Sequence, residues 1–158
     1  MSDRGVFVVA FTTVVLIVAG AFAIPQYFPF ELLKSLVFVA IAIMVFFGED
    51  KYSYMLGILA PLVGILLNIL LGGFFGEFTV LWASITMQPL PPLETPLHAL
   101  AILMEILLII LCLRAWRKEV SGPFFGKVFG VCLAISVAYG AVLAGWYMAG
   151  VRTVGRLP

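Results

Sequence analysis

Charged residues are scarce in this chain, and their scarcity excludes a water-soluble fold. Only 11% of the 158 residues are Asp, Glu, Lys or Arg, whereas 64% are hydrophobic. Soluble domains carry about 25% charged residues, and the mean hydropathy here is +1.21. We infer that lipid is the main solvent. The net charge of +1 comes without the basic patch that nucleic-acid binding requires, so no nucleic-acid partner is expected.

Cysteine and histidine are also rare. Cys112 and Cys132 are too few for a disulfide framework, so we expect two buried free thiols, with a bond between them as the alternative. His98 is the only histidine, and there is no CxxCH, which excludes bis-histidine or c-type haem. A lone imidazole could still bind a haem or a pigment magnesium axially. The ordinary alternative is a solvated or capping histidine at the membrane surface. No other cofactor and no metal site are predicted.

The common catalytic motifs are absent from the sequence. There is no HExxH, GxSxG, Walker loop or GxGxxG. A catalytic site would have to be assembled from Glu105, Asn68, Ser136 and Tyr139 alone. The sequence therefore favours a protein that is not an enzyme.

Long apolar runs are what the chain does contain. They predict an all-α integral membrane protein, a single transmembrane domain over 1–158 built as a bundle of about five helices. The expected spans are 5–24, 30–47, 54–71, 97–113 and 124–150. Segment 74–87 is apolar but short and interrupted by Gly76 and Glu77, so we expect an interfacial or re-entrant helix there. Residues 5–24 are longer than the apolar core of a signal peptide, although Ala19-Gly20-Ala21 leaves a cleaved signal as the alternative.

Local signals mark some boundaries and the orientation. Thr95 followed by Pro96 is typical of a helix start, and Gly72-Gly73 is typical of a helix end. With the N-terminus in the cytoplasm, six Lys and Arg residues fall inside and three outside. This count predicts a cytoplasmic N-terminus. The compact, loop-poor layout suggests a multi-pass protein of a bacterial or archaeal plasma membrane.

Polar residues inside the spans are the candidate site. Glu105 lies near the middle of its span, where a carboxylate needs a partner, a proton or water. His98, Glu105 and Cys112 are spaced by seven and so form one helix stripe. We expect Lys34 and Asn68 to share a pocket with this stripe, with His98 and Lys34 near the outer surface, Asn68 deeper and Glu105 near the midplane. The structural alternative is that Glu105 only holds neighbouring helices together.

Two further features concern packing. Glu31 and Lys34 are three residues apart, so we expect them to pair and extend towards water. The last span contains the small-residue pairs Gly126/Gly130, Gly140/Ala144 and Ala141/Gly145. Such pairs let helices approach closely. Their spread around the helix suggests contacts on two sides.

Two functional hypotheses lead from these patterns, with a membrane enzyme or a pigment carrier as a third. The first is a non-catalytic membrane subunit of a larger energy-transducing or transport assembly, which packs against partner subunits and lipid. The alternative is a small homo-oligomeric transporter, channel or ligand-binding membrane protein that uses Glu105 as an intramembrane proton, ion or ligand contact. A polar cavity joining Lys34, Asn68 and Glu105 would favour the alternative.

Overall fold

The computed structural model describes residues 2–25, 28–48, 50–89 and 95–154, and within them the protein is all-helical. The predicted fold class is confirmed, because five helices are long and apolar enough to cross a membrane and one apolar helix is shorter. In chain order the helices are α1 (Ser2–Ala23), α2 (Phe28–Phe46), α3 (Asp50–Leu70), α4 (Gly73–Ile85), α5 (Pro96–Glu119) and α6 (Lys127–Val154).

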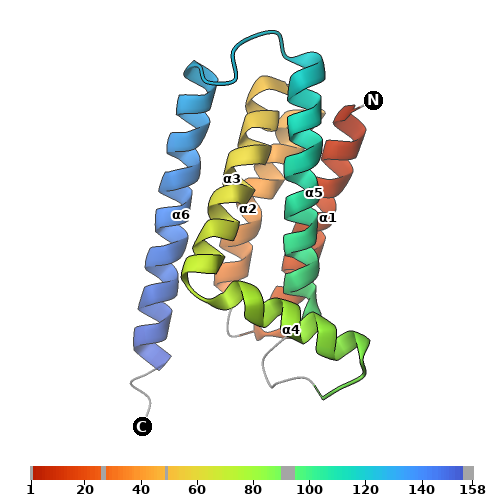
Figure 1. Cartoon of the computed structure of the whole chain (residues 1–158). Coiled ribbons are helices and arrows are strands. Elements are labelled where there is room, and N and C mark those ends of the chain that lie inside the picture. The colour runs from red at the N-terminus through yellow and green to blue at the C-terminus, as the bar shows by residue number, and fades with distance from the viewer. Residues whose placement is uncertain (1, 26–27, 49, 90–94, 155–158) are drawn as a thin grey trace.

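Helix length separates the spans from the short helix. The 22 residues of α1 measure about 33 Å at 1.5 Å per residue, enough for a hydrocarbon core of about 30 Å. Helix α4 has only 13 residues, or about 20 Å. Figure 1 shows α4 lying crosswise over one end of the long helices. The expected five spans and one additional short segment therefore each correspond to a helix.

Several helix boundaries differ by a few residues from the expected ones, and two of these differences lie where α5 joins α6. Helix α5 continues beyond Leu113 to Glu119, because Arg117 and Lys118 in its last turn can project out of the bilayer without ending the helix. Helix α6 begins at Lys127 rather than at 124. The ring of Phe124 instead packs edge-on against Trp116 at 5.7 Å, so the connecting loop covers the end of α5.

The start of α5 and the end of α3 follow the predicted local signals. The Thr95 side chain accepts a hydrogen bond from the Leu97 backbone N–H at 3.4 Å, and Pro96 occupies the first helical position. Gly72 has a φ of 79°, a left-handed conformation that glycine adopts without strain, and it separates α3 from α4. These two ends place α4 beneath the bundle.

Consecutive long helices run in opposite directions along the bundle, so α3 and α6 run parallel to each other (Figure 1). Helix α1 packs against α2 and α5, whereas α3 packs against α5, α6 and α2. Helix α6 lies at the edge and has its main contact with α3. The buried core includes Ile17, Ile41, Met55, Leu108 and Cys112, drawn from α1, α2, α3 and α5.

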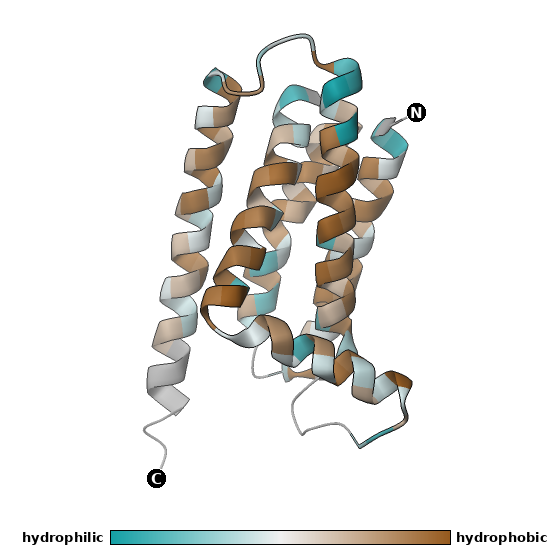
Figure 2. Cartoon of the chain, in the orientation of Figure 1, coloured by the Kyte–Doolittle hydropathy of each residue, from teal (hydrophilic) through white to brown (hydrophobic). Residues whose placement is uncertain are grey.

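The outer surface is apolar, as a lipid environment requires. Phe22, Phe46 and Leu70 are among the large apolar side chains that face outwards, at 68%, 74% and 80% exposed. Figure 2 shows hydrophobic residues along the middle of the long helices, and hydrophilic residues gathered near the α5–α6 loop. The protein is thus a multi-pass helical membrane protein.

The small residues of α6 contact the rest of the chain on one side. A Cβ atom at Gly140 would lie 2.7 Å from Val63, so this glycine lets α6 approach α3 closely. Cβ atoms at Gly130 and Gly145 would meet no atom within 4 Å, and Ala134 and Ala141 are exposed. Within one chain, the expected contacts on two sides are absent for these described residues.

Candidate ligand-binding cavity

A cavity of about 490 Å³ lies inside the bundle at the end covered by α4. Its walls come from α2, α3, α5 and α6, and α4 runs along its outer end. The lining includes Leu71, Gly72 and Gly76, which are exposed, so the cavity reaches the molecular surface near the α3–α4 turn. It therefore joins the interior of the membrane domain to one end of the bundle.

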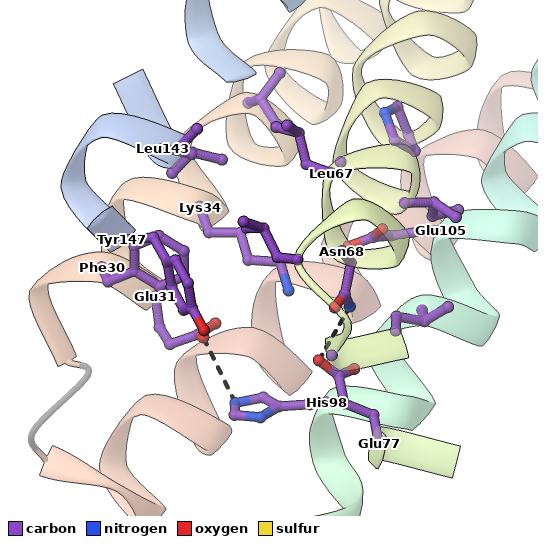
Figure 3. Close-up of a pocket in the computed structure, with 18 of the residues that line it drawn as sticks. Phe30, Glu31, Lys34, Leu67, Asn68, Glu77, His98, Glu105, Leu143 and Tyr147 are labelled. Carbon is purple, nitrogen blue, oxygen red and sulfur yellow. Dashed lines mark hydrogen bonds and ion pairs between the residues drawn. The ribbon is translucent and has the colours of Figure 1, made fainter. Parts of the chain in front are cut away.

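All four predicted site residues line this one cavity. Lys34, Asn68, His98 and Glu105 come from α2, α3 and α5, and Figure 3 shows their side chains around a shared space. Helix periodicity alone could place only His98 and Glu105 together. The packing of α3 between α2 and α5 adds the other two.

The expected depths of these residues need one correction. Asn68 is two residues from the end of α3, about 3 Å along the axis, whereas Lys34 is six residues, about 9 Å, into α2. Counted from the near end of its own helix, Lys34 therefore lies further in than Asn68, because α3 ends at Leu70 and turns into α4. Glu105 is nine residues into α5, about 14 Å, and it is the deepest of the four.

Glu105 is buried, with only 3% of its surface exposed. Its Oε1 atom has no hydrogen-bond partner in the described part of the chain. Gly64 of α3 faces the carboxylate, since a Cβ atom at that position would lie 4.0 Å from Oε2. A buried polar atom without a partner is uncommon and calls for water, a ligand or an ion.

Glu31 pairs differently from the sequence expectation. It is 5% exposed, and its Oε1 atom lies 3.7 Å from Nε2 of His98. It forms no ion pair with Lys34 within 4.0 Å among the residues described. The expectation that Glu31 and Lys34 extend together towards water was wrong, because Glu31 is buried and faces His98 of α5 instead of pairing with Lys34.

His98 is held between two helices. A Cβ atom at Gly20 of α1 would lie 2.9 Å from Nε2, so the imidazole packs directly on the α1 backbone. The same nitrogen faces Glu31. The geometry therefore places Nε2 against protein atoms, and the proposal of an axial haem or pigment ligand finds no open coordination position at this atom.

Glu77 of α4 is a cavity residue that sequence reasoning did not identify. Its Oε1 atom accepts a hydrogen bond from Nδ2 of Asn68 at 3.0 Å, which fastens α4 to the end of α3. Its Oε2 atom is buried and has no partner among the described residues. The sequence signal for Glu77 was a charge inside an apolar segment, but only the crosswise position of α4 brings that charge to the cavity.

The side chain of Lys34 brings a positive charge to the cavity. Within residues 2–25, 28–48, 50–89 and 95–154, no carboxylate oxygen lies within 4.0 Å of its ammonium group. Glu31, Glu77 and Glu105 nevertheless all lie close enough to interact with it electrostatically. The Tyr139 hydroxyl donates to the Lys34 backbone carbonyl at 2.7 Å, which connects α6 to this turn of α2.

The remaining walls are mainly apolar. Phe30 and Tyr147 lie side by side near the outer end, with ring centroids 6.4 Å apart. Phe38, Leu67 and Leu143 line other parts of the cavity. A few charged groups on an apolar wall are typical of a small-molecule binding site.

Of the other polar residues considered from sequence, Tyr139 lines the cavity, whereas Ser136 and the two cysteines lie elsewhere. Ser136 donates to its own helix, to the Cys132 carbonyl at 2.8 Å, and does not line the cavity. Cys112 and Cys132 are free and buried. Among the described residues, no group of three or more His, Cys, Asp or Glu side chains is arranged to hold a metal ion.

A second polar cluster lies at the opposite end of the bundle. The Tyr54 hydroxyl contacts a carboxylate oxygen of Asp3 and donates to Oε2 of Glu119, the latter at 2.7 Å. These contacts join α3 to the start of α1 and the end of α5. Cys112 and Gly57 pack between this cluster and the cavity, because a Cβ atom at Gly57 would lie 2.6 Å from the Cys112 sulfur.

Comparison with known proteins gives no family assignment: no family model, no curated protein and no solved structure matches this chain.

Proposed function

We propose that this protein is a small membrane transport protein that binds its substrate in the cavity between α2, α3, α5 and α6. The observation that carries the proposal is the group of buried, unpartnered carboxylate oxygens, on Glu31, Glu77 and Glu105, that share one cavity inside the membrane domain. Burying ionisable groups in a membrane is costly unless they are paired, hydrated or bound to a ligand.

The structural alternative accounts for the cavity less well. If Glu105 only held helices together, its oxygens would be expected to contact a donor on a neighbouring helix. Instead Oε1 has no partner in the described chain, and the space in front of it is lined by further charged side chains. This arrangement favours a site that a solute fills. We also propose that the site binds a solute and lets it cross the membrane, and that it does not catalyse a reaction.

A role within a larger assembly is supported by a separate observation. Gly130, Ala134, Ala141 and Gly145 lie on α6 away from the rest of the chain. Small residues of this kind form close helix–helix contacts in membranes. We propose that this face of α6 packs against another subunit, which is either a second copy or a different membrane protein.

The cavity proposal can be tested by thiol labelling in the membrane. Leu143 lines the cavity, whereas its neighbour Val142 is 55% exposed on the outer surface. We expect Leu143→Cys to react with the neutral, water-soluble reagent N-ethylmaleimide at least about ten times faster than Val142→Cys, because thiolates form only in contact with water.

The parent chain supplies the baseline for this experiment, because its two cysteines are buried. Equal, slow labelling of the two variants would show that the cavity is closed to water, and the proposed function would then lose its main support.

A further inference from the structure

We propose that the ligand of this cavity is a small organic cation with an apolar body. This inference rests on the proposed function and specifies its substrate class. Among the residues that the structure describes, three carboxylates and one ammonium group line the cavity, on Glu31, Glu77, Glu105 and Lys34. With all of these groups ionised they leave two negative charges when His98 is neutral, and one when it is protonated. While Glu105 is ionised, the excess is negative in either state of His98.

The hydrogen-bonding atoms point to the same ligand class. Oε2 of Glu31, Oε2 of Glu77 and Oε1 of Glu105 are buried and have no partner in the described chain. An ionised carboxylate oxygen only accepts hydrogen bonds. A ligand that satisfies these atoms must therefore bring donors, and an ammonium group offers up to three N–H donors together with the complementary charge.

Lys34 does not reverse this preference. Its ammonium group forms no ion pair within 4.0 Å with any described carboxylate, although all three act on it electrostatically. It reduces the repulsion among the carboxylates in the empty cavity. A bound cation would gain attraction from three carboxylates and lose some of it to repulsion from Lys34, so Lys34 should lower the affinity for that cation.

The walls define the rest of the ligand. Phe30 and Tyr147 form an aromatic pair near the outer end, and Phe38, Leu67 and Leu143 are apolar. Aromatic faces also attract cations directly. A volume of about 490 Å³ accommodates a small molecule rather than a bare metal ion. A compact amine with a hydrocarbon or aromatic body fits both the charge and the walls.

The test compares probes that share one body and differ in charge. Phenethylamine is the cation, 2-phenylethanol the neutral compound, phenylacetate the anion and phenylalanine the zwitterion. Each is assayed for its ability to protect Leu143→Cys from N-ethylmaleimide in membranes. We expect phenethylamine to protect at a concentration at least about ten times lower than the other three, given the charge of the cavity.

Substitutions with opposite expected effects exclude general damage to the fold. Glu105→Gln and Glu77→Gln should each weaken protection by phenethylamine about tenfold, whereas Lys34→Gln should strengthen it about tenfold. Glu119→Gln removes the same charge at the opposite end of the bundle, on a side chain that Tyr54 contacts. This substitution should change the protection by phenethylamine less than about twofold.

Several outcomes would overturn the inference. Better protection by phenylacetate or phenylalanine, combined with weaker protection in Lys34→Gln, would show that Lys34 recognises an anionic group. Equal protection by 2-phenylethanol would show that the cavity does not distinguish a cation from a neutral molecule. If none of the probes protects while N-ethylmaleimide still labels Leu143→Cys, the proposed organic-cation ligand is rejected. The proposal of a water-accessible cavity is then unaffected. Failure of that labelling would instead reject the proposed function.

Discussion

Single glycines decide where polar side chains can sit in this bundle. Gly20 has no Cβ, and the His98 imidazole occupies the space that a Cβ would fill, with Nε2 2.9 Å from that position. His98 in turn faces Glu31. The site therefore depends on a residue of α1 that has no functional group of its own.

This dependence leads to a stability prediction. Gly20→Ala should push the imidazole away from Glu31 and destabilise the protein by about 1–3 kcal/mol, as overpacked sites generally do. The measurement is thermal unfolding in mild detergent. Gly5→Ala is the matched control on the same helix, because a Cβ there would meet only Leu111 Cδ1 at an ordinary 3.8 Å, and the change should be neutral or slightly stabilising. Equal effects of the two substitutions would show that Gly20 makes no such contact.

Residue chemistry also sets the limit of what sequence could predict about the site. Lys34, Asn68, His98 and Glu105 could be identified because each interrupts an apolar run, where a polar group is costly unless it is paired, hydrated or functional. Glu31 was interpreted as a surface charge because it lies in the first turn of α2. Its burial depends on helices that are distant in sequence, and no local pattern contains that information.

At the scale of the helices, α3 and α5 pack along the length of the bundle, and the kind of side chain between them changes from one end to the other. At one end Glu105 lies opposite Gly64 across the cavity, and in the middle Cys112 packs on Gly57. At the other end Tyr54 donates to Glu119. Cys112 and Gly57 thus form the buried, close-packed middle of the α3–α5 interface, between the cavity and the Tyr54 cluster at the far end.

A double-mutant cycle tests whether Gly57 and Cys112 pack as closely as the structure indicates. Gly57→Ala should destabilise the protein by about 1–3 kcal/mol, because its Cβ would lie 2.6 Å from the Cys112 sulfur. In a Cys112→Ala background most of that penalty should disappear, because the sulfur is gone. Thermal unfolding of the four proteins gives the coupling energy. The same penalty in both backgrounds would contradict the contact.

The helices themselves were predictable to a large extent, for a physical reason. A membrane span needs about 20 apolar residues whatever its neighbours are, so α1, α2, α3, α5 and α6 could be recognised from composition. Helix α4 was recognisable as short. Its crosswise position, and with it the role of Glu77, follows from tertiary packing against α3 and α5, which hydropathy does not encode.

On the scale of the whole molecule, the two ends of the bundle differ. The α4 end contains the cavity, which the side chains of Glu31, Lys34, Glu77, His98 and Glu105 line. The other end holds the start of α1, the α2–α3 and α5–α6 connections, and the basic residues Arg114, Arg117, Lys118 and Lys127. The distribution of basic residues predicts that this second end faces the cytoplasm. The cavity would then open on the opposite side.

Transport requires more than the conformation described here. In this structure the core packs closely between the cavity and the α5–α6 end, at residues such as Ile41, Leu108 and Cys112. A protein that only binds a ligand from one side could keep that packing permanently. A transport protein must populate a second conformation, in which the same cavity opens towards the other side.

The most direct test of transport is therefore access to one cavity position from each side of the membrane. Right-side-out and inside-out vesicles carrying Leu143→Cys are treated with a membrane-impermeant thiol reagent, and Ser121→Cys in the exposed α5–α6 loop reports which side that loop faces. We predict that Ser121→Cys reacts from the cytoplasmic side alone, whereas Leu143→Cys reacts from both. Reaction of Leu143→Cys only from the side opposite Ser121→Cys would contradict transport and indicate a one-sided binding protein.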